Sequence, residues 1–146
     1  MENVVLGVER TAARELAETL EVDPGEPVIR LERIRTSEGE PMIYSLDVFP
    51  ASLIGSDEPD WREPLLGMIE SGGGPRIAYS HASIRAASLP ARARKRMPSS
   101  GRLPWLLLEQ LGHTARHRPI LYSLDYHRGD RFEFQTLRHR IEGTPT

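Results

Sequence analysis

The feature that most constrains this chain is a short pattern that occurs twice. The sequence reads PMIYSLDVFP from Pro41 and PILYSLDYHR from Pro119, so Pro-x-x-Tyr-Ser-Leu-Asp is repeated in full. Alternate side chains of a β-strand point to opposite faces of a sheet. In each copy, the Tyr and Leu side chains therefore share one face and the Ser and Asp side chains share the other. The repeat predicts two equivalent strands, each with an apolar and a polar face.

The two faces have different expected partners. We expect the apolar rows to pack under helices, which leaves the polar rows on the more open face of the sheet, where a small ligand is held. The apolar rows are Tyr44, Leu46 and Val48 in the first copy and Tyr122, Leu124 and Tyr126 in the second. The polar rows are Ser45, Asp47 and Phe49 in the first copy and Leu121, Ser123, Asp125 and His127 in the second.

The segments before the first copy predict a helix and a hairpin. Apolar residues at helical spacing in TAARELAETL predict a helix over 11–20, with Thr11 as its N-cap. The alternation and the β-branched residues of VIRLERIR predict a strand over 28–35. A turn over 37–41 joins it to the strand over 42–49.

The second half repeats this order after a connecting segment. The connection contains a short helix with Pro64 as its first residue and the glycines 72–74 as its end. The expected elements that follow are a strand over 77–86, a basic helix over 89–97, a hairpin of 106–111 and 120–127, and a further strand over 132–137. The halves then align, helix 11–20 with helix 90–97 and strand 28–35 with strand 105–111.

Length and composition bound the class of protein. A chain of 146 residues suits one domain over 1–146, with enough length to bury a core. No apolar stretch has the length of a membrane helix, and the N-terminal sequence lacks the basic start and long apolar run of a signal peptide. We therefore expect a cytoplasmic protein with no membrane partner.

Several kinds of chemistry are excluded or disfavoured. The chain has no cysteine, which excludes disulfides, thiolate nucleophiles and cysteine-ligated zinc. His113 and His117 have the spacing of two metal ligands on a helix but fall in a predicted turn, so we expect neither a metal nor a cofactor. The net charge of −2 gives no general attraction to nucleic acid, and the basic cluster over 92–96 is interpreted as a solvated helix face.

Beyond the repeat, a series of motifs carries a family resemblance. The series AxxLxVxPGEPVIRLERIRxxxGEPMIYSLDVFP is followed by PILYSLDYHRGDRFEF near the end of the chain. Together they resemble the UTRA domain, the effector-binding part of the GntR/HutC class of bacterial transcription regulators, over residues 13–134.

The resemblance implies a fold, a function and an assembly. The implied fold is α+β and chorismate-lyase-like, a mainly antiparallel sheet backed by helices and built from pseudo-duplicated halves. The implied function is to bind a small metabolite and to pass its occupancy to a DNA-binding domain, within a homodimer. In the family a winged helix-turn-helix precedes this domain; here residues 3–8 already read as the first strand, so contact with DNA is expected only through a domain that this chain lacks. Whether the chain is an excised domain or a stand-alone protein stays open.

The resemblance also implies an anion-binding pair, Arg33 and Arg35. Two residues apart on a strand, they share a face, and two guanidinium groups can clasp a phosphate or carboxylate. The alternative is that one or both arginines only pair with Glu32, Glu40 or Asp47.

The other implied pocket positions depart from the sugar-phosphate-sensing members. Ser45 and Leu121 stand where those members carry acidic residues, Leu66 stands in place of a tyrosine near the short helix, and His127 replaces another tyrosine. We expect these four residues to shape the rest of the pocket and to favour a less polar ligand with one carboxylate or similar anion. For His127, the alternative is an exposed side chain beside Arg128.

Two other functions stay open. The fold is shared with a lyase, and Asp47, Asp125 and His127 are the candidate acids and bases, but the recurrence of the aspartates in duplicated strands favours a structural role and no enzymatic activity. A ligand-free dimerisation module, in which edge strands pair across a twofold axis, is the other alternative. The Arg33-x-Arg35 pair favours the metabolite sensor.

Overall fold

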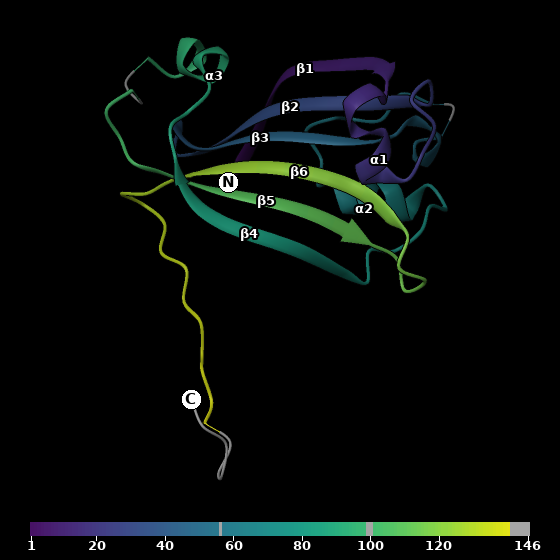
Figure 1. Cartoon of the computed structure of the whole chain (residues 1–146). Coiled ribbons are helices and arrows are strands. Elements are labelled where there is room, and N and C mark those ends of the chain that lie inside the picture. Colours follow the sequence, from purple (N-terminus) through teal and green to yellow (C-terminus); the bar gives the residue numbers. More distant parts are fainter. Residues whose placement is uncertain (56, 99–100, 141–146) are drawn as a thin grey trace.

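The computed structural model describes residues 1–55, 57–98 and 101–140. Within these residues, six strands form one antiparallel sheet in the order β1-β2-β3-β6-β5-β4 (Figure 1). The strands are β1 (Glu2–Ala12), β2 (Pro27–Ser37), β3 (Glu40–Pro50), β4 (Tyr79–Ala87), β5 (Trp105–His113) and β6 (Pro119–Arg128). The helices are α1 (Ala17–Leu20), α2 (Leu65–Ser71) and α3 (Ala91–Arg96), with short 3-10 turns at Arg14–Leu16 and Ala51–Leu53. The predicted α+β architecture with a mainly antiparallel sheet is confirmed.

The two halves of the chain have the same element order. The first half runs β1, α1, β2, β3, the second runs β4, α3, β5, β6, and α2 lies in the connection between them. The halves join where β3 pairs with β6, the two strands that carry the repeated pattern. The predicted match of α1 with α3 and of β2 with β5 is therefore confirmed, with a pseudo-twofold axis between β3 and β6.

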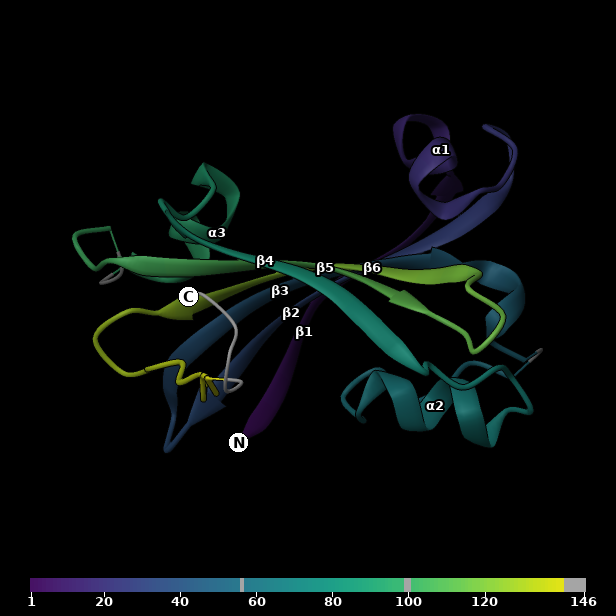
Figure 2. The ribbon, with the colours of Figure 1, turned by 60° about the horizontal axis from the view of Figure 1, so that its bottom comes forward.

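Helices lie on both faces of the sheet (Figure 2). On one face, Tyr44 and Tyr126 pack against Ala93 and Met97 around α3. Also on that face, Val48 packs against Ala17 and Leu20 of α1, as the apolar rows predicted. The opposite face carries α2, whose buried residues Leu65 and Ile69 pack on Ile29, Leu31 and Phe49. Because α2 covers one end of this face, the polar rows lie in the space beside it.

The prediction of a helix over 11–20 is wrong in its extent. β1 continues to Ala12, and Thr11 pairs with Val28 in the ladder with β2, so Thr11 is not an N-cap. A 3-10 turn follows, and the α-helix begins only at Ala17. The apolar spacing that favoured a helix is still used, since Ala13, Ala17 and Leu20 are buried in one cluster. The ladder takes the backbone groups that a longer helix would need.

The short helix α2 lies close to its predicted place. Pro64 is the residue before the helix rather than its first residue, and the helix ends at Ser71 with Gly72 as its C-cap. A Cβ atom on Gly74 would lie 2.7 Å from the carbonyl oxygen of Ile69, so the chain leaves the helix through a space that only glycine fits.

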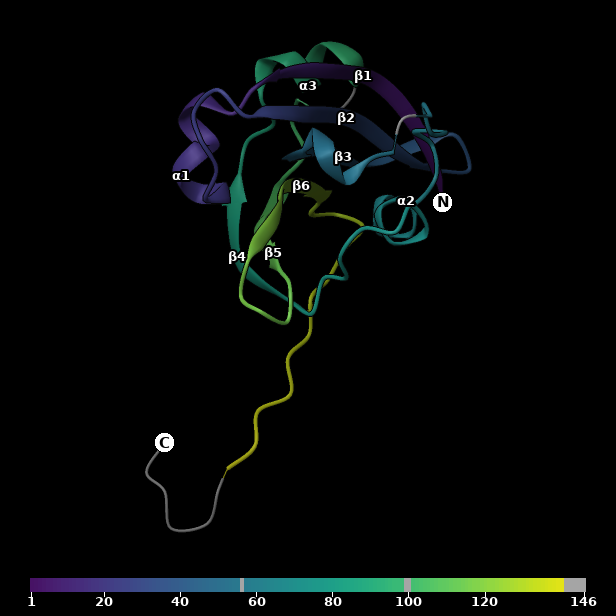
Figure 3. The same ribbon diagram turned by 90° about the vertical axis from the view of Figure 1, so that its right-hand side faces the viewer.

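The predicted strand over 132–137 is also wrong. No strand is formed between residues 131 and 140, and this segment runs away from the sheet (Figure 3). Its alternating sequence is typical of a strand, but a strand needs a neighbour to accept its backbone hydrogen bonds. Within the described chain, none of the six strands pairs with it.

The two edges of the sheet are β1 and β4. Every residue of β4 from Tyr79 to Ala86 is exposed, and Ile84 keeps 54% of its surface accessible.

No helix in the described part of the chain has the length and apolar character needed to cross a bilayer.

Candidate ligand-binding site

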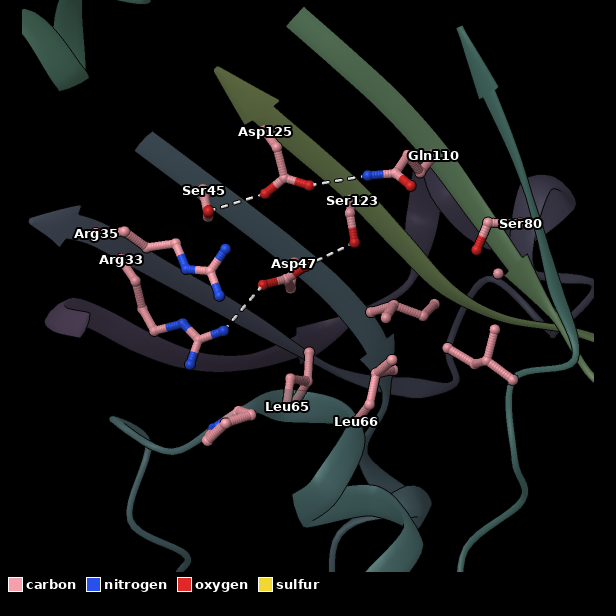
Figure 4. Close-up of a pocket in the computed structure, with 14 residues that line it drawn as sticks. Arg33, Arg35, Ser45, Asp47, Leu65, Leu66, Ser80, Gln110, Ser123 and Asp125 are labelled. Carbon is pink, nitrogen blue, oxygen red and sulfur yellow. Dashed lines mark hydrogen bonds and ion pairs between the residues drawn. The ribbon is translucent and has the colours of Figure 1, made fainter. Parts of the chain in front are cut away.

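A cavity of about 340 Å³ opens on the polar face of the sheet, next to α2 (Figure 4). Its size lies at the lower end of the range for small-molecule sites. Strands β2 to β6 supply its polar side chains, and its apolar side comes from α2, the segment before β4 and Leu121 of β6. The lining residues are Arg33, Arg35, Ser45, Asp47, Pro64, Leu65, Leu66, Ile77, Ser80, Gln110, Gly112, Leu121, Ser123 and Asp125.

The repeated Ser and Asp residues exchange hydrogen bonds across the pseudo-twofold axis. Ser45 Oγ donates to Asp125 Oδ1 at 2.8 Å, and Ser123 Oγ donates to Asp47 Oδ1 at 2.6 Å. Each serine thus serves the aspartate of the other copy. This exchange ties β3 to β6 through side chains as well as through the backbone ladder.

Arg33 is buried and largely committed to protein partners. Its Nη1 donates to the carbonyl oxygens of Trp61 at 3.0 Å and Glu63 at 2.9 Å, and its Nη2 lies 3.6 Å from Asp47 Oδ2. Its Nε is buried with no hydrogen-bond partner among the described residues. Burial lowers the pKa of the Arg33 guanidinium, while the charge of Asp47 opposes that shift. Arg33 therefore holds the segment before α2 against the cavity. The alternative that the arginines pair with acidic residues applies to Arg33, which pairs with Asp47.

Arg35 has a different environment. Its side chain is exposed, and its Nε donates to Asn3 Oδ1 at 3.3 Å. Across the described residues, no acidic side chain lies within ion-pair distance of Arg35. Because its terminal nitrogens are not taken up by those residues, Arg35 is the arginine of the pair that can donate to an anion in the cavity.

The partner of Asp125 reveals where the two halves differ. Gln110 Nε2 donates to Asp125 Oδ2 at 3.1 Å, and Gln110 lies opposite Ser123 as Arg33 lies opposite Ser45. Gln110 is therefore the pseudo-symmetric counterpart of Arg33. One aspartate of the cavity is paired with a cation, and the other with a neutral amide.

Asp47 is buried in this network and is hard to ionise. Burial and the nearby charge of Asp125 raise the pKa of Asp47 from 3.8 to about 6. The Ser123 hydrogen bond and the charges of Arg33 and Arg35 act in the opposite direction but are outweighed. The cavity thus holds a carboxyl whose proton occupancy responds to its surroundings close to neutral pH.

Five of the six predicted site residues line this cavity: Arg33, Arg35, Ser45, Leu66 and Leu121. His127 does not line it. Its ring packs edge-on against Phe132 and Phe134, with centroid distances of 4.9 and 5.2 Å, and burial lowers its pKa. The start of the C-terminal segment therefore covers the face of His127 that was expected to meet a ligand. That these five residues bind a ligand stays a prediction.

Strand alternation placed Asp47 and Asp125 on the face with the predicted pocket, but their recurrence in duplicated strands favoured a structural role. Both aspartates line the cavity, so it is more polar than the loss of acidic residues at Ser45 and Leu121 indicated. Ser123 was placed on the same face and also lines the cavity, whereas Gln110 was missed as a lining residue. The signal for Gln110 was present, because aligning the two copies strand by strand places it at the position of Arg33.

The histidines with metal-like spacing have other partners. The ring of Tyr79 stacks on His113 with centroids 4.8 Å apart, and its hydroxyl lies 2.8 Å from His117 Nδ1. Among the described residues, no group of three or more His, Cys, Asp or Glu side chains is placed to hold a metal ion.

Comparison with known sequences identifies relatives. The family model described as UTRA domain matches residues 1–133. The HTH-type transcriptional regulator GmuR of Bacillus subtilis is 29% identical over 127 residues, covering 86% of this chain and 54% of GmuR. The HTH-type transcriptional repressor PhnF of Mycolicibacterium smegmatis is 31% identical over 133 residues, covering 88% of this chain and 53% of PhnF. The chain spans about half the length of these curated relatives.

Solved structures agree with the sequence comparison. The effector domain of PhnF from Mycobacterium smegmatis matches with a TM-score of 0.86 at 25% identity, covering 95% of this chain and 87% of that domain. A GntR-family regulator from Bacillus cereus matches with a TM-score of 0.81 at 21% identity, covering 94% and 98%, which shows a shared fold. The fold is the α+β, chorismate-lyase-like fold that the resemblance implied. With its family model matched over residues 1–133 and its six-stranded duplicated sheet, this chain belongs to the UTRA domain family.

Proposed function

We propose that this UTRA domain is the effector-binding part of a GntR/HutC-type transcription regulator, and that it binds a small anionic metabolite in the cavity beside α2. The observation that carries the proposal is Arg35, a guanidinium at the cavity with open donors and no acidic partner among the described residues. The names of GmuR and PhnF as HTH-type transcriptional regulators support a regulatory role. DNA contact then belongs to an attached or partner domain.

Arg33 offers a route by which occupancy changes the protein. It joins Asp47, a cavity residue, to the backbone of Trp61 and Glu63 in the segment that leads into α2. A ligand that interacts with Asp47 alters the strength of this connection. Such a ligand shifts the regulator between two arrangements only if it binds one of them more tightly, because equal affinity shifts nothing.

The proposal includes a homodimer, a cytoplasmic location and no catalytic turnover. The exposed edge strand β4, with Ile84 and Tyr79 accessible, supports a contact between copies of the chain. The aspartates of the cavity are bound to Ser45, Ser123, Gln110 and Arg33, which supports a binding role rather than a role as a free acid or base.

The test is a thermal-unfolding screen of the purified chain with anionic metabolites, from sugar phosphates to aliphatic and aromatic carboxylates. A ligand at about 100 times its dissociation constant adds roughly 2.7 kcal/mol to the free energy of unfolding, a shift of several degrees. We expect a shift that Arg35→Ala abolishes, and a ligand that NMR finds unchanged after prolonged incubation. A ligand that is consumed supports the enzyme, and a folded dimer that no compound stabilises supports the ligand-free module.

A further inference from the structure

The cavity is lined by equal numbers of positively and negatively charged side chains, but only one pair of opposite charges among them is in contact. Arg33, Arg35, Asp47 and Asp125 are its four charged lining residues. Arg33 and Asp47 form an ion pair at 3.6 Å, so these two charges largely compensate each other. Arg35 and Asp125 are left, and neither has an oppositely charged side chain within ion-pair distance in the described part of the chain.

Among the described residues, Asp125 accepts side-chain hydrogen bonds from neutral donors only. Ser45 donates to its Oδ1 and Gln110 donates to its Oδ2, so the carboxylate is oriented by neutral groups. Its charge is attracted by Arg33, but that guanidinium forms its ion pair with Asp47. Each carboxylate oxygen has capacity for more than one hydrogen bond, so both can accept from a ligand as well. The carboxyl of Asp47 lies nearby, and the negative charge of Asp125 helps to raise the pKa of Asp47.

We propose that the cavity binds a zwitterion, with the anionic group of the ligand at Arg35 and a protonated amine at Asp125. This assignment rests on the proposed effector-binding function and names its ligand class. The ligand supplies to each unpaired side chain the opposite charge that the protein does not supply.

A simple anion fits this charge arrangement less well. It satisfies Arg35 but brings negative charge towards Asp47 and Asp125, and it leaves Asp125 uncompensated when the ligand displaces water. A ligand ammonium donates charge-assisted hydrogen bonds to Asp125 and reduces the repulsion between the two aspartates. The apolar side of the cavity, formed by Leu65, Leu66 and Leu121, contacts the carbon chain between the charged groups.

The two charged side chains come from strands that are not neighbours. Arg35 is on β2 and Asp125 is on β6, with β3 between them. Arg35 lies level with His127 in the ladders, so Asp125 is also two residues along β6 from it. At about 4.8 Å per strand spacing and about 3.3 Å per residue, the two backbones are roughly 12 Å apart. The anionic group and the amine of the ligand are therefore separated by a spacer. The flexible side chain of Arg35 allows a range of spacer lengths.

The experiment uses matched probe sets, with ω-amino carboxylates and aminoalkyl phosphates of graded spacer length. Each amino compound is compared with its N-acetyl and its hydroxyl counterpart, which keep the anion and remove the positive charge. In the wild-type chain we expect the amino compound of the best-fitting set to bind roughly tenfold to hundredfold more tightly than its counterparts, measured by calorimetry.

Two cavity variants and one control locate the effect. Asp125→Asn keeps the acceptor for Ser45 and removes the charge, so the preference for the amino compound should disappear while anion binding through Arg35 remains. Gln110→Arg places a cation beside Asp125, as Arg33 lies beside Asp47, and should reverse the preference towards the uncharged counterparts, even if Asp125→Asn folds poorly. Glu109→Gln is the control. Glu109 lies next to Gln110 on β5 but on the opposite face of the sheet, where it accepts a hydrogen bond from Tyr122, so its loss should not change the preference for the amino compound.

The outcomes separate this inference from the proposed function. Loss of the amino preference in Asp125→Asn, or its reversal in Gln110→Arg, supports the zwitterion. Equal binding of all three members of every set overturns the zwitterion and leaves the anion sensor intact. A preference that survives in both variants overturns the assignment to Asp125. If no probe binds the wild-type chain, both the zwitterion and the anion sensor are overturned for ligands of this size.

Discussion

Leu46 lies directly opposite Leu124 in the ladder between β3 and β6. Because both leucines are the same residue of the repeated pattern, the pseudo-twofold axis of the sheet passes between them. The axis explains why the chain carries the pattern twice: a residue on one side of Leu46 meets the residue on the opposite side of Leu124. Ser45 therefore faces Asp125, Asp47 faces Ser123, and four residues build a network that one strand alone does not contain.

Replacing Arg33 and replacing Arg35 should have different effects on stability and on ligand binding. Arg33→Ala removes the partner of the buried Asp47 and two hydrogen bonds to the segment before α2, so we expect a loss of roughly 3–5 kcal/mol in the free energy of unfolding. Arg35→Ala removes an exposed side chain and should change stability by less than about 0.5 kcal/mol while weakening anion binding. Urea denaturation combined with calorimetry tests both, and equal stability losses would contradict the assignment.

Asp47 should make stability depend on pH. The folded state holds the Asp47 proton more tightly than the unfolded chain does, since burial raises the pKa to about 6 from 3.8. Its stabilising contribution is complete below about pH 4 and is lost as the pH rises through about 6. Asp47→Asn copies the neutral form, so wild type and variant should be equally stable near about pH 4, with the variant more stable by about 3 kcal/mol at about pH 7. A stability difference that does not vary with pH would show that Asp47 titrates normally.

The exchanged serines allow a specific test of the network. The hydrogen bond from Ser123 lowers the pKa of Asp47, so Ser123→Ala should raise that pKa further above 6. Ser45→Ala is the matched control, because Ser45 donates to Asp125 and not to Asp47. A carboxyl-carbon NMR titration of both variants measures the shift. Equal shifts in the two variants would mean that the serines do not act on separate aspartates.

Gly129 should not tolerate a side chain. A Cβ atom there would lie 2.9 Å from the carbonyl oxygen of Pro104, to which the Gly129 amide donates at 2.7 Å. We expect Gly129→Ala to cost roughly 1–3 kcal/mol through overpacking. Gly25→Ala is the control, since nothing lies within 4 Å of a Cβ atom at that position. Thermal unfolding that finds the same small effect for both would contradict the close contact at Pro104.

The proposed dimer contact can be tested at both edges of the sheet. Ile84→Lys places a charge on the exposed strand β4 and should give a monomer in analytical ultracentrifugation. Val4→Lys on the other edge strand, β1, should leave the dimer intact. Dissociation by Val4→Lys alone would move the contact to β1, and a monomeric wild type would remove the dimer from the proposal.

The sequence predicted the centre of the sheet better than its periphery. The alternation within the repeated strands is a local property, so it assigned Tyr44 and Ser45 to the correct faces. Alternation also placed Arg33 and Arg35 on one face of their own strand. Where the outcome depends on a neighbour, prediction failed: the β2 ladder converts the expected start of a helix at Thr11 into strand, and the segment over 132–137 has no strand beside it.

The chemistry of the site depended on contacts between distant residues. The pairing of Arg33 with Trp61 and Glu63 joins segments that no local pattern connects. The aspartates were attributed to structure because they recur, whereas they serve both structure and cavity. The packing of His127 against Phe132 and Phe134 depends on the path of the C-terminal segment, which alternation alone described wrongly.

Gln110 in the place of a second arginine gives the cavity a direction. A cavity with true twofold symmetry would accept a ligand in two equivalent orientations, and its two ends would report the same event. Among the described lining residues, guanidinium groups come from β2 and not from β5, so the two orientations of a ligand would differ in energy. A ligand bound as proposed would place its anionic end on the β2 side, where Arg33 holds the backbone of Trp61 and Glu63. The substitution of one residue in a duplicated sheet would therefore fix which end of the proposed ligand lies on the side of the segment that leads into α2.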